Sequence, residues 1–117
     1  MSAESAVYAA LSGAAGVVAI ASTRIFHDAR EQKTDLPAVI YVRTGTNFDV
    51  NVHGAVDLMR TTLAVMSFAL TRAAVEALAD ACQAALIAAY MTPVERVSDF
   101  DPESEIFSST LVIEHRA

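Results

Sequence analysis

The sequence predicts an α+β fold in which one mixed, mostly antiparallel sheet of four to five strands packs against two helices. Three observations predict it: an apolar stripe at helical spacing in the second half of the chain, a strand pair with a turn signal in the middle, and a second strand pair around an acidic connection near the end. The chain has 117 residues, enough for one hydrophobic core. Residues 1–117 are therefore expected to form a single domain.

The N-terminal part predicts one helix and one brief strand. Ser2 is a suitable N-cap and Glu4 suits the first turn of a helix that runs to about Ser12, where Gly13 ends it. "AAGVVAIAS" is then a short apolar connection or a further helical turn, "RIFHD" is a brief β-like segment, and "AREQKTD" is a surface loop. Because Glu4 stands where basic residues are required, and Gly13 and Gly16 interrupt the apolar run, neither a signal peptide nor a membrane span is expected.

The middle of the chain predicts a long hairpin. Pro37 is tolerated at the entry of a strand, so "LPAVIYVRTGT" predicts a strand that starts near Ala38. The second strand is "LMRTTLAVMSFAL", and turn signals between Asn47 and Asp57 predict an extended loop at about residues 46–57. Both faces of the second strand are apolar around its middle, which is typical of a central strand covered on both sides by helices or by a neighbouring subunit.

The second helix has the clearest pattern in the chain. Thr71 is its predicted N-cap, and the helix runs from Arg72 to about Tyr90, before Thr92-Pro93 stops it. Its apolar stripe consists of Val75, Leu78, Cys82, Leu86 and Ala89. "VERVSDF" and "IFSSTLVIEHR" are then predicted as the last two strands, on either side of an acidic loop.

Composition bears on partners and on oligomeric state. The net charge is −6 and the eight Lys and Arg residues are scattered, which argues against a sequence-independent grip on nucleic acid. The single cysteine, Cys82, excludes an internal disulfide. Hydrophobic residues make up 54% of the chain, but Trp is absent and aromatics are 7%, so small side chains fill the core. Such a core stabilises a monomer weakly, which favours a homo-oligomer.

No stretch of the sequence predicts catalysis, a cofactor or a metal site. "SDFDPESE" carries alternate acids, but counting from Asp99 an EF-hand would need Gly at Ser104 and Glu at Thr110, so a solvated strand connection is the favoured interpretation. The three histidines have no metal-ligand spacing. Cys82 on the apolar stripe is interpreted as a buried thiol, and nucleotide-binding and nucleophile-elbow motifs are absent.

The order of landmarks resembles that of the tail terminator, or tail-completion, proteins of long-tailed bacteriophages and phage-derived particles. The likeness covers nearly the whole chain. The landmarks are "AVYAALSG", "TRIFHD", "LPAVIYV", "VHGAVD", "RTTLAVMSFAL", "TRAAVEALADACQAAL" and "DFDPESEIFSSTLVIEH".

This resemblance implies a virion protein that is assembled in the host cytoplasm and is not an enzyme. It implies a homo-oligomer, a hexameric ring, at the head-proximal end of the tail tube, in contact with the tail tube protein and a head-completion or stopper protein of the neck. DNA would pass through the lumen without specific binding, which suits a negatively charged protein. The expected contact residues are Asn47, Phe48, Asp49, Val50, Asn51 and His53 in the loop, and Asp99, Asp101, Glu103 and Glu105 in the acidic turn.

Two other functions fit the sequence. Another neck component, a stopper or adaptor, shares most of these features. An oligomeric small-molecule-binding or enzymatic α+β domain would instead place Cys82 or the acidic cluster in a concave pocket with convergent polar groups.

Overall fold

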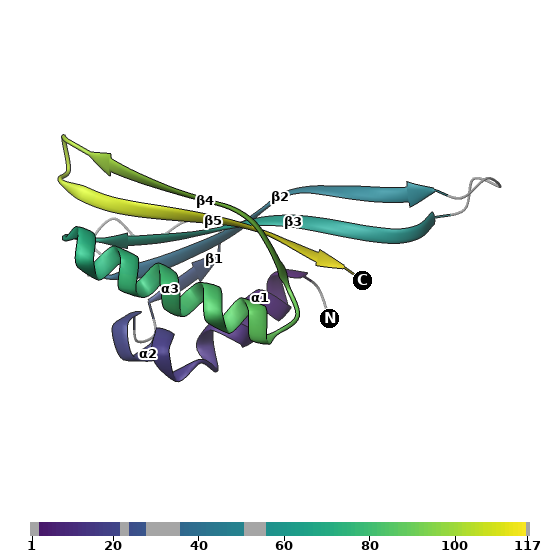
Figure 1. Cartoon of the computed structure of the whole chain (residues 1–117), viewed down its shortest axis with the longest axis horizontal. Helices are drawn as coiled ribbons and strands as arrows, with labels where there is room; N and C mark the ends of the chain where they lie inside the picture. Colours follow the sequence, from purple (N-terminus) through teal and green to yellow (C-terminus); the bar gives the residue numbers. More distant parts are fainter. Residues whose placement is uncertain (1–2, 22–23, 28–35, 51–55, 117) are drawn as a thin grey trace.

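The computed structural model describes residues 3–21, 24–27, 36–50 and 56–116. It confirms an α+β fold: a five-stranded sheet in the order β1-β2-β3-β5-β4 is covered on one face by helices. Figure 1 shows α1, α2 and α3 together on one side of the sheet. The β1–β2 pair is parallel and the other three pairs are antiparallel.

The helices within the described residues number three, one more than predicted. They are α1 (Ala3–Ser12), α2 (Ala15–Ala21) and α3 (Arg72–Ala88). The segment that the sequence left open as a connection or a further helical turn is α2, whose Val17 and Ala21 are buried in the core. At the start of α3, the predicted N-cap is confirmed, because the Thr71 hydroxyl accepts a hydrogen bond of 3.1 Å from the Ala74 N–H.

The strands are β1 (Ile25–His27), β2 (Ala38–Val50), β3 (Val56–Ala69), β4 (Thr92–Asp101) and β5 (Ile106–Arg116). The central position of β3 in the sheet agrees with its two apolar faces. β4 begins at Thr92, so the Thr92-Pro93 pair that was predicted to stop the helix also starts a strand. Pro93 is tolerated there because it stands at the entry of an edge strand.

The predicted loop at residues 46–57 is wrong in its extent. β2 continues to Val50 and β3 begins at Val56, with Asn47 opposite Arg60 and Val50 opposite Val56. Asn and Asp residues predict turns locally, but here each backbone position from 46 to 50 has a cross-strand partner, and that pairing prevails over the local preference. Residues 51–55, at the predicted tip, lie outside the described residues.

The core lies between the sheet and the helices. It combines Val7 and Leu11 of α1 with the apolar stripe of α3 and with alternate residues of the central strands. Those strand residues are Val39, Tyr41, Leu63, Val65, Leu111 and Ile113. Of the predicted stripe of α3, Val75, Leu78, Cys82 and Leu86 are buried and Ala89 is exposed, because the helix ends one residue before it.

No single described helix is long and apolar enough to span a bilayer; α1 and α2 pass that test of length and composition only as a pair, with a bend of 80° between them.

Candidate interaction surface

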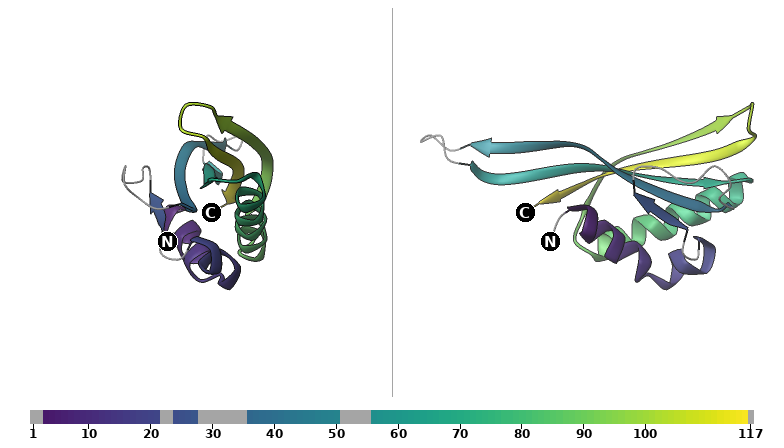
Figure 2. Two further views of the ribbon diagram at one scale, coloured as in Figure 1. Left: turned by 90° about the vertical axis from the view of Figure 1, so that its left-hand side faces the viewer. Right: turned by 180° about the vertical axis from the view of Figure 1, so that it is seen from behind.

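One face of the sheet carries no described helix, and its centre is apolar. Strand residues alternate between faces, so the positions between the core residues point away from the helices. At the centre these are Ala38, Ile40, Val42, Ala64, Met66, Phe68 and Val112. The two views in Figure 2 show the three helices stacked on the opposite side of the sheet. Ala38, Ile40 and Ala64 are buried, whereas the other four are partly exposed. The partly exposed residues make this helix-free face the first candidate for contact with another protein.

β2 and β3 continue together beyond the rest of the sheet and form an arm, defined here as residues 47–50 and 56–59. β5 pairs with β3 only from Arg60 to Ala69, so in the arm β3 pairs with β2 alone. The arm extends away from the helices in Figure 1, and the molecule measures 52 × 29 × 22 Å. A two-stranded ribbon is marginally stable in water, which makes the arm a candidate for ordering by a partner.

The structure places the predicted loop residues in this arm as far as it describes them. Asn47, Phe48, Asp49 and Val50 form the last part of β2, as backbone positions opposite residues of β3. Asn51 and His53 lie outside the described residues. The predicted contact loop is therefore largely a paired ribbon.

The predicted acidic residues divide between a strand and a turn. Asp99 and Asp101 belong to β4, opposite Ser108 and Ile106 of β5, whereas Glu103 and Glu105 form the turn that follows. Asp99 and Asp101 share the helix-free face with Glu95, because all three sit at alternate positions. All of these acids are exposed. The acidic stretch is thus half strand and half connection, and its strand part forms a negative column along the edge of the sheet.

Asp101 organises the turn. Its carboxylate accepts hydrogen bonds from the Glu103 N–H at 3.0 Å and the Ser104 hydroxyl at 2.8 Å. The hydrogen bond from Ser104, followed by that from Glu103, lowers the pKa of Asp101. Glu105 has a φ of 58°, a left-handed conformation that closes the turn while its N–H donates to the Asp101 carbonyl at 2.8 Å.

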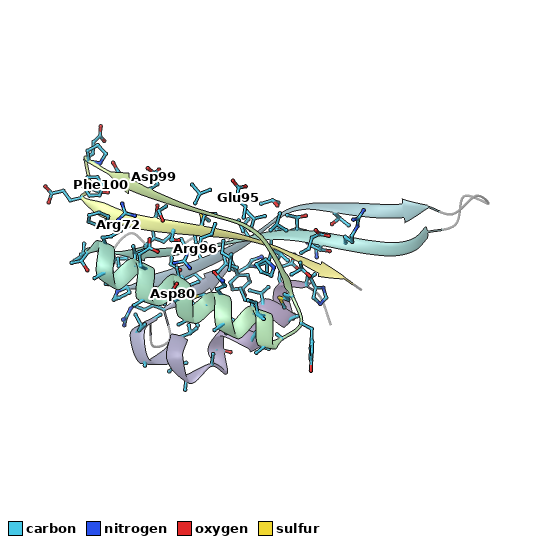
Figure 3. All side chains as sticks on the ribbon, in the orientation of Figure 1. Arg72, Asp80, Glu95, Arg96, Asp99 and Phe100 are labelled. Atoms are coloured by element: carbon cyan, nitrogen blue, oxygen red, sulfur yellow. The ribbon has the colours of Figure 1, made fainter. Side chains whose placement is uncertain are left out.

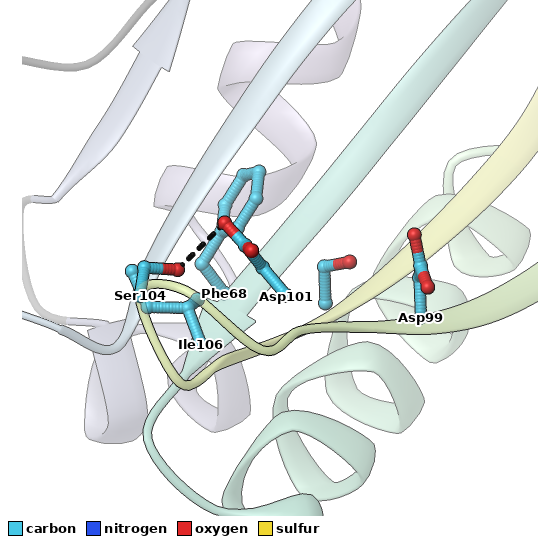
Figure 4. Close-up of a pocket in the computed structure, with 6 residues that line it drawn as sticks. Phe68, Asp99, Asp101, Ser104 and Ile106 are labelled. Carbon is cyan, nitrogen blue, oxygen red and sulfur yellow. Dashed lines mark hydrogen bonds between the residues drawn. The ribbon is translucent and has the colours of Figure 1, made fainter.

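A hollow of about 290 Å³ lies beside this turn on the helix-free face. It is lined by Phe68, Asp99, Asp101, Ser104, Ile106 and Ser108 (Figure 4). The dashed line in Figure 4 joins Asp101 to Ser104, so two of the polar groups in the hollow bond to one another. The hollow therefore has the chemistry of a turn next to an aromatic ring rather than that of a catalytic site.

An arginine cluster fastens β4 to α3. The Arg96 guanidinium donates to Asp80 at 2.7 Å, to Glu76 at 2.6 Å and to Gln83 at 3.1 Å. Ser98 adds a hydrogen bond of 3.0 Å to Glu76. Figure 3 shows Arg96 between β4 and Asp80 of the helix. Asp99 and Glu95 lie on opposite sides of Arg96 along the strand. Sequence reasoning missed this cluster, because its partners are 13 to 22 residues apart and show no local spacing.

β4 is exposed along almost its whole length, and it carries large apolar side chains. Val94 is 58% exposed and Val97 is 50% exposed, and Phe100 packs on Phe107 with 4.5 Å between ring centroids while remaining 39% exposed. In the sequence, "VERVSD" combines two valines with three charged residues, and charged residues are typical of an edge strand.

The residues considered for chemistry have no catalytic arrangement in the described part of the chain. Cys82 is buried against Ser67, whose hydroxyl lies 3.9 Å from the sulfur, and burial raises the pKa of this thiol to about 11. A thiol with such a pKa is protonated at neutral pH and is a poor nucleophile. Among the described residues, no group of three or more His, Cys, Asp or Glu side chains is arranged to hold a metal ion.

Comparisons with known proteins identify a family and, separately, a shared fold. A family model described as "Tail completion protein gp17" matches residues 5–116. No curated protein sequence matches the chain. Among solved structures, the fold is similar to that of a chain in the "Virion of native gene transfer agent (GTA) particle", with a TM-score of 0.78 and 16% sequence identity. That match covers 97% of this chain and 92% of the other, and at this identity it shows a shared fold.

Proposed function

We propose that copies of this chain, which belongs to the tail completion protein gp17 family, form a closed ring. This ring would cap the head-proximal end of a phage tail tube. Membership makes the chain a structural protein of a phage-like tail. The ring would end polymerisation of the tube, join the tail to the neck and leave a passage for DNA. Its output would be assembly instead of catalysis.

The observation that carries this proposal is the incompleteness of the subunit. In the described chain, the strands of the arm, β2 and β3, pair only with each other and project from the sheet. The apolar helix-free face has no covering helix in the described chain. Two such features on a small protein favour completion by other subunits. A ring requires a heterologous contact, in which two different surfaces of one subunit meet the matching surfaces of its neighbours.

The charge of the protein supports a passage for DNA. Glu95, Asp99 and Asp101 form an exposed acidic column on the helix-free face, and the net charge is −6. In the described residues, the guanidinium of Arg96 is already engaged by carboxylates of α3, so it does not offset this column. A negative lumen would repel phosphates and let DNA slide without binding.

The proposed partners follow from this position. Six copies would form the ring, the tail tube protein would lie below it, and a head-completion or stopper protein would lie above it. The residues proposed for these contacts are those of the arm, Asn47 to Val50 with Asn51 and His53, and the acidic residues Asp99, Asp101, Glu103 and Glu105. The protein would assemble in the host cytoplasm and remain in the mature particle.

Particles assembled without this protein test the proposal. We expect electron microscopy to show tails of uncontrolled length, because nothing would stop the tube from growing. Tails of normal length with heads that leak DNA would instead assign the chain to the stopper position. Complementation with the intact chain is the control, and it should restore tails of uniform length.

A further inference from the structure

The sheet has two open edges of similar length. β4 (Thr92–Asp101) is the last strand of the sheet and pairs only with β5. At the opposite edge, β1 covers β2 only over Val39, Ile40 and Tyr41, so residues 42–50 of β2 have no strand on their outer side in the described chain. Along these segments, ten residues of β4 and nine of β2, the backbone donors and acceptors of alternate residues therefore point outward without a strand partner in the described chain.

Each edge has only part of the protection that isolated sheets normally show. Proteins block their edges with short strands, charged side chains, proline, β-bulges or a covering helix, because an open edge invites pairing with another chain. Both edges contain a bulge, between Pro93 and Glu95 in β4 and between Arg43 and Gly45 in β2. β4 also carries Pro93 and charged residues, but it is ten residues long and exposes Val94, Val97 and Phe100. Near the opposite edge, Tyr8 is 48% exposed beside Tyr41, with 6.3 Å between the ring centroids. Exposed apolar residues thus accompany both edges.

Charge decides which edges can pair with each other. From Thr92 to Glu105, β4 and its turn carry the five carboxylates Glu95, Asp99, Asp101, Glu103 and Glu105. The one arginine in this range, Arg96, is held by Glu76 and Asp80. Pairing of two β4 strands would oppose like charges across the new contact, which is destabilising. Residues 42–50 carry one base, Arg43, which is paired with Glu4 of α1, and one acid, Asp49. This edge therefore opposes an acidic strand with far less negative charge than a second β4 would.

We propose that β4 of one copy pairs with the outer edge of β2, residues 42–50, of the next copy, so that the sheets join edge to edge around the ring. The occupant of each open edge is thus a second copy of this chain. Main-chain hydrogen bonds supply the contact, as in other cases of strand addition. Because the two edges are different surfaces at opposite sides of one sheet, the contact is heterologous and repeats from copy to copy. This inference rests on the ring proposed above and identifies its subunit interface.

Photo-cross-linking tests the interface and does not require knowledge of which residues of β4 and β2 pair with each other. p-Benzoylphenylalanine replaces Val97, whose half-exposed side chain tolerates a larger group, and the assembled protein is irradiated and mapped by mass spectrometry. We expect cross-links between subunits to fall within residues 42–50. The matched control replaces Ile87, which is 48% exposed and belongs to helix α3 instead of an edge strand, and cross-links from it should not concentrate in residues 42–50.

The outcomes separate this inference from the proposed function. An intact ring with cross-links from position 97 only to other segments overturns the edge pairing and leaves the ring in place. A protein that stays monomeric when unmodified removes the ring itself. Amide hydrogen exchange on the unmodified protein provides a second measurement, in case the substituted chain does not assemble. Edge pairing predicts that alternate β4 amides lose their fast exchange on assembly, and unchanged exchange along β4 in an intact ring would contradict it.

Discussion

At the scale of single residues, Asp101 has the best-defined role in the acidic stretch. Its carboxylate accepts two hydrogen bonds within the β4–β5 turn, and these lower its pKa. A carboxyl group whose pKa is lower in the folded state stabilises the fold when it is ionised. That contribution is present above the pKa of the unfolded chain and is lost as the pH falls through the pKa of the folded state.

The Asp101→Ala variant is therefore expected to be less stable than the original protein at pH 7, with a difference that shrinks as the pH falls below about 4. Thermal unfolding midpoints between pH 7 and pH 3 measure this. Glu103→Ala is the matched control, because it removes one negative charge from the same turn. A difference that does not shrink between pH 7 and pH 3, or an equal effect in the control, would contradict the role of Asp101.

At the scale of elements, β4 depends on two attachments. It pairs with β5 along one side, and the Arg96 cluster ties it to Glu76 and Asp80 of α3. A planar guanidinium can hold several carboxylates at once, which an ammonium group cannot do in the same geometry. We infer that Arg96 fixes the position of β4 relative to α3, and with it the position of the acidic residues of β4.

Arg96→Ala should cost about 1 kcal/mol of unfolding free energy at low salt, as expected for a partly exposed ion-pair network. The loss should be smaller in 1 M salt, since salt screens exposed pairs. Urea unfolding at both salt concentrations measures it. Arg43→Ala is the control, because Arg43 forms an exposed ion pair with Glu4 outside this cluster. Equal losses for both variants would show that Arg96 has no special position.

The arm is the element whose removal should separate folding from assembly. Replacing residues 48–59 by Asn-Gly joins Asn47 to Arg60 through a two-residue turn that follows the observed register. We expect an unfolding midpoint close to that of the original chain, because β3 pairs with β5 only from Arg60 onward. Assembly should be lost, as measured by sedimentation. An unfolded variant would show that the arm belongs to the fold, and a variant that still assembles would remove the arm from the interface.

How far the sequence predicts these elements depends on whether their causes are local. α3 follows from its apolar spacing and its Thr71 cap, and the alternation of Leu63 and Val65 marks β3 as a central strand. The length of the arm does not follow, because Asn47 and Asp49 favour turns until their partners on β3 are known. The Arg96 cluster also depends on contacts between distant segments, so no local pattern predicts it.

At the scale of the whole molecule, the sheet has one face covered by helices, one helix-free face and two open edges. The helices and the core complete one side, whereas the arm, the acidic column of β4 and the outer edge of β2 remain available to other copies. The family match and these surfaces support the same proposal, a ring subunit of a phage-like tail.

The mass of the assembled protein in solution tests this proposal most directly. Native mass spectrometry of the purified chain, alone and with tail tube protein, is expected to give a closed oligomer whose mass is six times that of one chain. The variant in which Asn-Gly replaces residues 48–59, measured under the same conditions, should give the mass of a monomer. A monomer for the intact chain under both conditions would contradict the account.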